Sequence, residues 1–210
     1  MARPKAFDID AALVRAMELF WEQGYAATSM EQLVQTMGIR RQSLYDTFGD
    51  KHRLFLAAMD SYCAMLEDAM LAPLKAPDAG LQALHETGMA IIDFLLRYPK
   101  RRACLMANTT LELAPHDAEV AAKVRAHMQN MENAFRHALG NAQARGEIAA
   151  GGDLTALAKY LVGMAHGLMV MAKSGADREA LIVILSTAVA PLMPAPGFRP
   201  AAVSQQRKTS

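Results

Sequence analysis

Proline is absent from residues 5–72 and again from residues 116–190, and this restricts the fold more than any other feature of the sequence. Because proline ends helices, long helices are permitted in both stretches. The helix-forming residues Ala and Leu together number 64, whereas the β-branched residues Val and Ile number only 16. This balance favours helices over strands. We therefore predict an all-α chain of about nine helices.

Length, charge and cysteine content limit the class of protein. The 210 residues correspond to one larger domain or two small ones, and an apolar fraction of 52% excludes disorder over most of the chain. Lys plus Arg number 22 and Asp plus Glu number 21, so a surface for nucleic acid must come from local placement of charge. Cys63 and Cys104 lack a Cys-x-x-Cys spacing, which favours reduced thiols in a cytoplasmic protein.

The apolar segments favour a cytoplasmic protein without a membrane partner. The first residues lead into an acidic stretch and not into an apolar signal core. The most apolar stretch, residues 160–172, is shorter than the roughly 20 residues that a membrane-spanning helix needs.

Apolar periodicity and capping residues locate the helices. A first helix runs from Asp10 to Gly24, and Thr28-Ser29-Met30-Glu31 predicts a capping box in which Thr28 is the cap. The helix that follows ends at Gly38, a third short helix holds Leu44 and Phe48, and Asp50 caps a longer fourth helix. Further helices are predicted near residues 79–97, 101–113, 117–145, 153–173 and 177–192, with Asp117, Asp153 and Asp177 as caps. Residues 194–210 lack periodicity and are predicted to be a disordered tail.

Residues 28–48 contain two short helices joined by Gly38-Ile39-Arg40-Arg41. This is the helix-turn-helix arrangement, in which the second helix enters the major groove of DNA. The second helix is too short to be explained by packing, and it begins with residues that suit base edges and phosphates, Arg41, Gln42 and Ser43. Basic residues flank the motif on both sides: Arg3, Lys5, Lys51 and Arg53. The pattern favours DNA binding over a plain packed hairpin.

The motif in this segment is Phe20-x-x-x-Gly24-Tyr25-x-x-Thr28-Ser29, then Gly38-Ile39-x-x-x-Ser43-Leu44-Tyr45-x-x-Phe48-x-x-Lys51-x-x-Leu54. It resembles the DNA-binding domain of the TetR/AcrR transcriptional regulators. The resemblance covers about residues 6–66. It implies a ligand-binding and dimerisation domain over residues 67–193, followed by the tail.

The resemblance also implies roles for single residues. Thr28 and Ser29 would begin the supporting helix at a phosphate, since exposed amides there favour an anion. Tyr45 and Lys51 would each hold a phosphate. The residues expected at base edges are Arg41, Gln42 and Ser43, with Arg40 able to reach either target. Asp46 departs from the family pattern, because an acid near phosphates is unfavourable unless it accepts from a cytosine amine.

The family usually has a ligand pocket within its fourth to eighth helices. Fifteen methionines suggest an adaptable interior, because unbranched thioethers can repack around different ligands. The residues predicted to line a pocket are Met65, Met89, Phe94, Met106, Asn108, Thr109, Met128, Met131, Phe135, His166 and Met169. Each of them could instead be ordinary core.

The family usually dimerises through its last two helices. Apolar residues predict this interface on two helices: Leu157, Leu161, Met164 and Leu168, then Leu181, Ile184, Leu185 and Ala188. Gly163 and Gly167 would allow close backbone approach. The alternative is that these helices pack within one chain, since a helix that is apolar all round must be buried somewhere.

We expect a homodimeric repressor that a small apolar or aromatic effector releases from a palindromic double-stranded operator. Helix four, from Asp50 to about Leu71, should be the only element that touches both DNA surface and pocket, with Met59, Tyr62 and Met65 sensing the ligand. The sequence contains no catalytic motif, and no histidine pair has metal-ligand spacing, so we expect neither an enzyme nor a cofactor.

Two alternatives stay open. Cys104 follows residues 100–102, which are Lys, Arg and Arg, at a predicted helix start. Both features favour a thiolate, so a repressor that senses oxidants or electrophiles is one alternative, although a buried thiol that behaves as a small hydrophobe is the favoured interpretation. A protein of another class, a helical interaction protein that never contacts DNA, is the second alternative.

Overall fold

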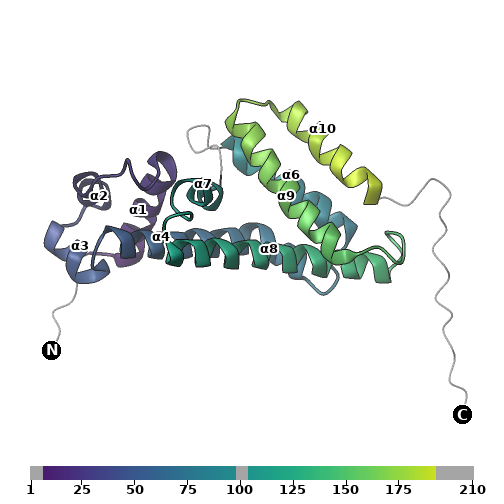
Figure 1. Ribbon diagram of the computed structural model, residues 1–210, viewed down its shortest axis with the longest axis horizontal. Coiled ribbons are helices and arrows are strands. Elements are labelled where there is room, and N and C mark those ends of the chain that lie inside the picture. Colours follow the sequence, from purple (N-terminus) through teal and green to yellow (C-terminus); the bar gives the residue numbers. More distant parts are fainter. Residues whose placement is uncertain (1–6, 98–103, 193–210) are drawn as a thin grey trace, which may run out of the picture.

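The computed structural model describes residues 7–97 and 104–192, and all regular structure within these ranges is helical (Figure 1). The elements are α1 (Ile9–Gln23), α2 (Met30–Met37), α3 (Arg41–Phe48), α4 (Lys51–Leu66), η1 (Glu67–Leu71), α5 (Ala72–Lys75), α6 (Leu81–Arg97), α7 (Leu105–Glu112), α8 (Ala118–Ala144), α9 (Leu154–Lys173), α10 (Arg178–Val189) and η3 (Ala190–Leu192). Since α4, η1 and α5 are continuous, the described part has nine α-helical elements, which confirms the all-α prediction. Arg3, Lys5, residues 100–102 and the tail at 194–210 lie outside the described residues.

The first three helices form a small unit that α4 closes. Phe20 of α1, Leu33 of α2 and Leu44 of α3 are fully buried in one core with Phe55 of α4. Arg15 of α1 donates from Nη2 to the carbonyl oxygen of Met37 at 2.7 Å. This bond satisfies an end carbonyl of α2 and fixes the angle between α1 and the helix-turn-helix.

The cap of α2 is Ser29 and not Thr28, which corrects the prediction. Ser29 Oγ accepts from the Gln32 amide at 3.1 Å, and Gln32 Oε1 accepts from the Ser29 amide at 2.8 Å. Thr28 is 1% exposed, and its hydroxyl donates to the Gly24 carbonyl at 2.6 Å. Thr28 therefore closes the turn after α1, and the capping box starts one residue later than predicted.

The fourth helix continues past Pro73 to Lys75, although proline was expected to interrupt the chain there. The turn before it, η1, is a π-helix at Glu67–Leu71. Proline lacks an amide proton, and its ring clashes with the carbonyl four residues earlier, so a widened turn in front of Pro73 relieves that clash. The wide turn follows α4, which packs against α1, and it contacts α6, so it lies where the helix leaves the N-terminal unit.

The C-terminal bundle consists of α6, α8, α9 and α10, with α7 between it and the N-terminal unit (Figure 1). Asp117, Asp153 and Asp177 cap α8, α9 and α10, as predicted. At Gly88 of α6, an added Cβ would lie 2.6 Å from Leu185 Cδ1 of α10, so glycine permits this close contact. Among the described residues, α9 is the one helix that is long and apolar enough, by length and composition, to cross a membrane. It extends beyond residues 160–172, the apolar stretch identified in the sequence.

Aromatic rings pack across the junction of the two units. Trp21 of α1 stacks on Phe94 of α6 with ring centroids 5.4 Å apart, and meets the Tyr62 ring of α4 edge-on at 5.1 Å. Such pairs contribute about 0.5–1.5 kcal/mol beyond their area burial. The N-terminal unit is therefore packed against both α4 and α6.

Glu112, at the end of α7, makes a polar contact across the same junction. Its carboxylate accepts from the backbone amides of Tyr25 at 3.1 Å and Ala26 at 2.7 Å, in the turn between α1 and α2. Gly24 allows this approach, because it has φ 85° and an added Cβ would lie 2.9 Å from Glu112 Oε2. No local pattern in the sequence indicates this contact, since the partners are 87 and 86 residues apart.

We predict that Glu112→Ala frees the turn between α1 and α2. Losing the acceptor leaves two amides unpaired near the surface, which should cost about 1 kcal/mol of unfolding free energy. Amide hydrogen exchange at Tyr25 and Ala26, followed by NMR, should become faster. Leu111→Ala, at an 83% exposed position on the same helix, is the control. Unchanged exchange in Glu112→Ala would contradict the contact.

Candidate nucleic-acid interface and interior cavity

One face of α3 is anchored in the core and the other is open to solvent. Leu44 is fully buried, whereas Arg41 and Gln42 are exposed and Tyr45 is 38% exposed. Ser43 is half-buried at the edge of this face, and Arg40 is exposed directly before the helix. The predicted contact residues of α3 therefore share one outward surface, while Leu44 holds it rigidly.

Two contacts organise this surface. Gln42 Nε2 donates to Asp46 Oδ1 at 2.8 Å, so the unexpected acid has a partner within its own helix. The Arg41 guanidinium carbon lies 5.9 Å from the centroid of the Tyr45 ring. Arg41 and Gln42 keep free donors that can reach base edges or phosphates.

Of the other predicted phosphate contacts, Ser29 is exposed at the start of α2, but Thr28 is not available. Its buried hydroxyl donates to the Gly24 carbonyl, so Thr28 does not present this group to a phosphate. Lys51, at the start of α4, holds its Nζ 4.3 Å from the centroid of the Tyr25 ring. Partial burial lowers the pKa of this ammonium, and Glu112 opposes that effect.

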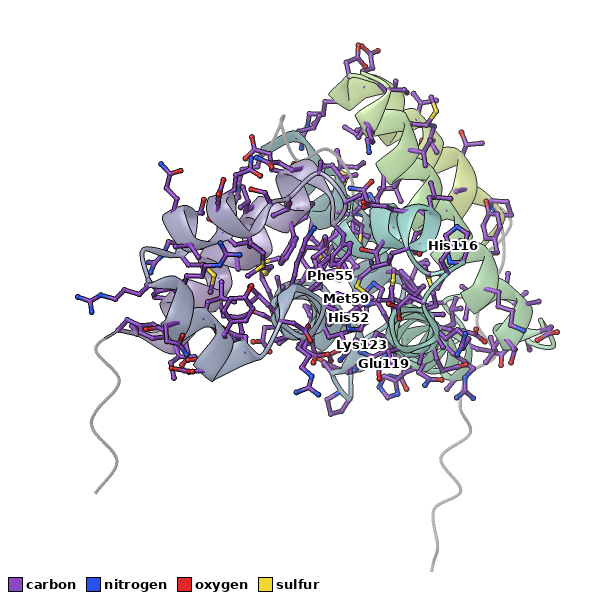
Figure 2. All side chains as sticks on the ribbon, turned by 60° about the vertical axis from the view of Figure 1, so that its left-hand side comes forward. His52, Phe55, Met59, His116, Glu119 and Lys123 are labelled. Carbon is purple, nitrogen blue, oxygen red and sulfur yellow. The ribbon has the colours of Figure 1, made fainter. Side chains whose placement is uncertain are left out.

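Three further polar contacts join α4 to α8, in the region where Figure 2 labels His52, Glu119 and Lys123. His52 Nε2 lies 2.6 Å from Asp117 Oδ2, and the His52 ring is 4.0 Å from Glu119 Oε2. Lys123 of α8 forms an ion pair with Asp60 of α4. These contacts and Glu112 correct the expectation that helix four is the only element reaching both parts of the molecule.

A small apolar cavity lies between the end of α4, η1, α6, α8 and α9. Its lining residues are Leu66, Met70, Leu71, Thr87, Ile91, His127, Met131, Phe135 and Met169. Its free volume of about 20 Å³ has room for about one water molecule. Three residues predicted for a pocket, Met131, Phe135 and Met169, are in this lining.

The other residues predicted for a pocket lie elsewhere. Phe94 stacks on Trp21, and Asn108 accepts from Lys173 Nζ at 2.9 Å near the surface. Met106 and Thr109 are buried in the core outside the lining, and Met65, Met89 and Met128 are half-buried outside it. His166 bonds through Nδ1 to the Val162 carbonyl at 2.8 Å and is close enough to His127 to affect its pKa.

Sequence analysis missed six lining residues: Leu66, Met70, Leu71, Thr87, Ile91 and His127. A signal existed for two of them. Thr87 occupies the apolar stripe of α6, three residues after Leu84 and four before Ile91, and His127 lies between Val124 and Met131 on the stripe of α8. A polar residue inside a buried stripe needs a partner, and this marks both positions as candidates.

The environment of Cys104 contradicts the predicted thiolate. Cys104 is 1% exposed, and burial raises the pKa of its thiol, with hydrogen bonds from its surroundings only partly opposing this effect. Burial likewise raises the pKa of Cys63 to about 11, with Cys104 nearby adding to the shift. Both cysteines are free thiols, and neither has the lowered pKa that marks a reactive cysteine.

Most of the predicted dimer residues lie inside the chain. Leu161 and Leu168 of α9 and Leu181, Leu185 and Ala188 of α10 are buried, because both helices pack on the rest of the bundle. Leu157, Met164 and Ile184 are half-buried. The exposed apolar positions are others: Tyr160, Val170 and Met171 on α9, with Val183 on α10. Gly163 and Gly167 lie on α9 between Tyr160 and Val170, and each faces open space, with no atom within 4 Å of an added Cβ.

We predict that His127 makes stability depend on pH. Burial lowers the pKa of its imidazole from 6.5 to about 4, with His166 adding to the shift and Glu67 opposing it. Between these values the unfolded chain binds the proton and the folded chain does not, so stability decreases as pH falls from 6.5 to 4. The loss should approach about 3 kcal/mol.

Urea unfolding at about pH 7 and about pH 4.5 measures this loss. His127→Gln should remove that part of the pH dependence, whereas His85→Gln, at an exposed position, should retain it. Equal pH dependence in the wild type and His127→Gln would show that this imidazole is not the cause.

Comparison with known proteins places this geometry in a family. Two sequence-family models match this chain. The family described as bacterial regulatory proteins, tetR family, matches residues 12–58, and the family described as tetracyclin repressor-like, C-terminal domain, matches residues 80–187. The transcriptional regulator YezE of Bacillus subtilis (strain 168) is 37% identical over 86% of this chain and 94% of its own. The transcriptional repressor ComR of Escherichia coli (strain K12) is 34% identical over 88% and 89%.

Solved structures agree. A cysteine-substituted variant of the TetR family regulator CifR, complexed with double-strand operator DNA, has a TM-score of 0.81 at 30% identity. The match covers 92% of this chain and 100% of that chain. The members of this family are transcriptional regulators and not enzymes. The chain therefore belongs to the tetR family of bacterial transcriptional regulators.

Proposed function

We propose that the protein is a homodimeric repressor that binds a palindromic double-stranded operator through α3 and leaves it when a small effector enters the interior cavity. The outward surface of α3 carries this proposal, because Leu44 fixes the helix while Arg41, Gln42 and Tyr45 face solvent. The operator complex of the CifR variant and the repressor ComR support it. Such a regulator acts in the cytoplasm, where it reaches the DNA.

The contacts divide into two kinds. Arg41 and Gln42 carry the donors that suit base edges, with Ser43 beside them at the edge of the surface. Other groups would contact phosphates and so position the helix on the DNA: Tyr45, Lys51, Arg40, and Ser29 with the first amides of α2. Thr28 supports this arrangement indirectly, by closing the turn in front of Ser29.

The exposed stripe of α9 supports the homodimer. Tyr160, Gly163, Gly167 and Val170 recur every three or four residues, so they share one face of the helix, and Val183 of α10 is exposed as well. Glycines on such a stripe let two backbones approach closely. A two-fold operator needs two recognition helices about 34–36 Å apart, which a dimer through this face would provide.

The effector would act where η1 borders the cavity. Leu66, Met70 and Leu71 line the cavity from the helix that begins at Lys51 beside α3. A ligand that enlarges the cavity would move this helix, and the contacts of Glu112 and His52 would carry the movement to the N-terminal unit. A 100-fold loss of operator affinity requires about 2.7 kcal/mol of differential ligand binding.

We predict different effects for two basic residues at the DNA surface. Arg41→Ala should relax sequence preference and cost about 1–3 kcal/mol on the matched operator if the side chain reads a guanine. Lys51→Ala should weaken binding to all sequences similarly and reduce the salt slope by about one unit. Fluorescence anisotropy on matched and mismatched fragments, selected from genomic DNA by the purified protein, measures both.

A uniform loss across fragments in Arg41→Ala would limit Arg41 to phosphate contact. An unchanged salt slope in Lys51→Ala would exclude its phosphate contact. Failure of the wild type to bind any selected fragment would refute the proposed function and favour an interaction protein that does not contact DNA.

We predict that Val170→Asp converts a dimer into a folded monomer. Val170 is 63% exposed in the single chain, so the carboxylate is tolerated there, but in a dimer interface it would be buried without a partner. Light scattering measures the mass, and circular dichroism confirms folding. Val14→Asp, at an exposed apolar position on α1, is the control and should remain dimeric. A wild type that is monomeric at micromolar concentration would contradict the homodimer.

A further inference from the structure

Two residues that line the interior cavity each carry a buried polar atom that the fold leaves without a partner. Thr87 is 3% exposed and His127 is 5% exposed, and both line the cavity. Within the described ranges, Thr87 Oγ1 and His127 Nε2 are buried and make no hydrogen bond. Such groups are rare in native proteins, because leaving them unpaired is unfavourable. Two of them on residues that line one cavity suit a bound molecule that pairs with them.

The hydrogen-bonding roles of these atoms follow from their neighbours. Cys63 Sγ lies 3.7 Å from His127 Nδ1. The Cys63 thiol keeps its proton, because burial raises its pKa to about 11, and it can donate this proton to Nδ1. The hydrogen of the neutral imidazole is then on Nε2, which makes that atom a donor. The Thr87 hydroxyl can donate as well, so both atoms suit an oxygen that accepts hydrogen bonds.

The rest of the cavity wall limits charge and size. Its other described lining residues are aliphatic, thioether or phenyl side chains, which give a charged ligand group no ionic partner. Burial of an unpaired charge is strongly unfavourable. Met70, Met131 and Met169 can change rotamer to enlarge a cavity that now holds about one water molecule, so a small molecule suits it best.

We propose that the cavity binds small uncharged molecules with a carbonyl or hydroxyl oxygen, to which Thr87 and His127 donate while the apolar wall encloses a short hydrocarbon chain. This inference rests on the proposed function only in taking such a molecule to be the effector. Binding to the free protein is a separate property, so the two can fail separately.

The test compares three probes of equal chain length: pentanone, pentanoate and pentylammonium. Calorimetry and thermal unfolding with the full-length protein measure binding, and fluorescence anisotropy measures operator release. Pentanone should bind and raise the Tm, whereas the two charged probes should not. Binding of pentanone without operator release would support the cavity ligand and count against the proposed effector response.

Two variants separate the polar contact from a general effect of the substitution. Thr87→Val keeps the shape but removes the unpaired hydroxyl, so it should raise the Tm of the ligand-free protein while weakening pentanone binding about tenfold. Thr155→Val, the same change at an exposed position of α9 outside the cavity, should keep the pentanone affinity of the wild type. No pentanone binding, a preference for either charged probe, or wild-type affinity in Thr87→Val would overturn the proposal.

Discussion

The rest of the structure depends on the burial of one continuous helix, residues 51–75. Near its start, Leu54, Phe55 and Ala58 pack in the core of the N-terminal unit, and near its end Met70 and Leu71 border the interior cavity. Because this helix belongs to both cores, the recognition helix cannot change its position relative to the bundle without repacking one of them. Close-packed cores resist gradual deformation, which suits a regulator with two discrete states.

Polar contacts at the junction make this coupling specific. Glu112 holds the turn before α2, and Asp117 holds His52 at the start of α4. Each is partly exposed and contributes little to global stability. These contacts matter because of where they lie: Glu112 joins the N-terminal unit to α7, and Asp117 joins it to the start of α8.

The sequence was sufficient for the helices and most of their caps, because periodicity and residues such as Asp153 and Asp177 act locally. The cap of α2 was the exception: Thr28 and Ser29 are adjacent residues that can both cap a helix, and the Thr28 bond to Gly24 decides between them. Most of the residues predicted for the dimer interface lie inside the chain, because α9 and α10 are apolar on both faces and periodicity could not distinguish the inner face from the outer. Glu112 was missed because its partners lie far away along the chain.

The candidate site likewise contains residues that the local sequence predicts and residues that depend on contacts between distant parts of the chain. The α3 residues were predictable from a local motif, whereas the cavity depends on how four helices meet. Met131, Phe135 and Met169 were found because they lie on apolar stripes, but Thr87 and His127 were passed over because polar residues were sought elsewhere. The predicted reactive Cys104 failed because helix position favours a thiolate only where water or a cation can reach it, and here burial dominates.

The central claim is that the cavity and α3 are coupled through the buried helix. The most direct test is calorimetric titration of a molecule that releases the operator into the free protein and into the operator complex. Because coupling between two sites is reciprocal, operator DNA must weaken effector binding by the factor by which the effector weakens DNA binding. We predict equal factors in the two experiments. Equal effector affinities for free and operator-bound protein would contradict the account and leave a DNA-binding protein without allosteric control.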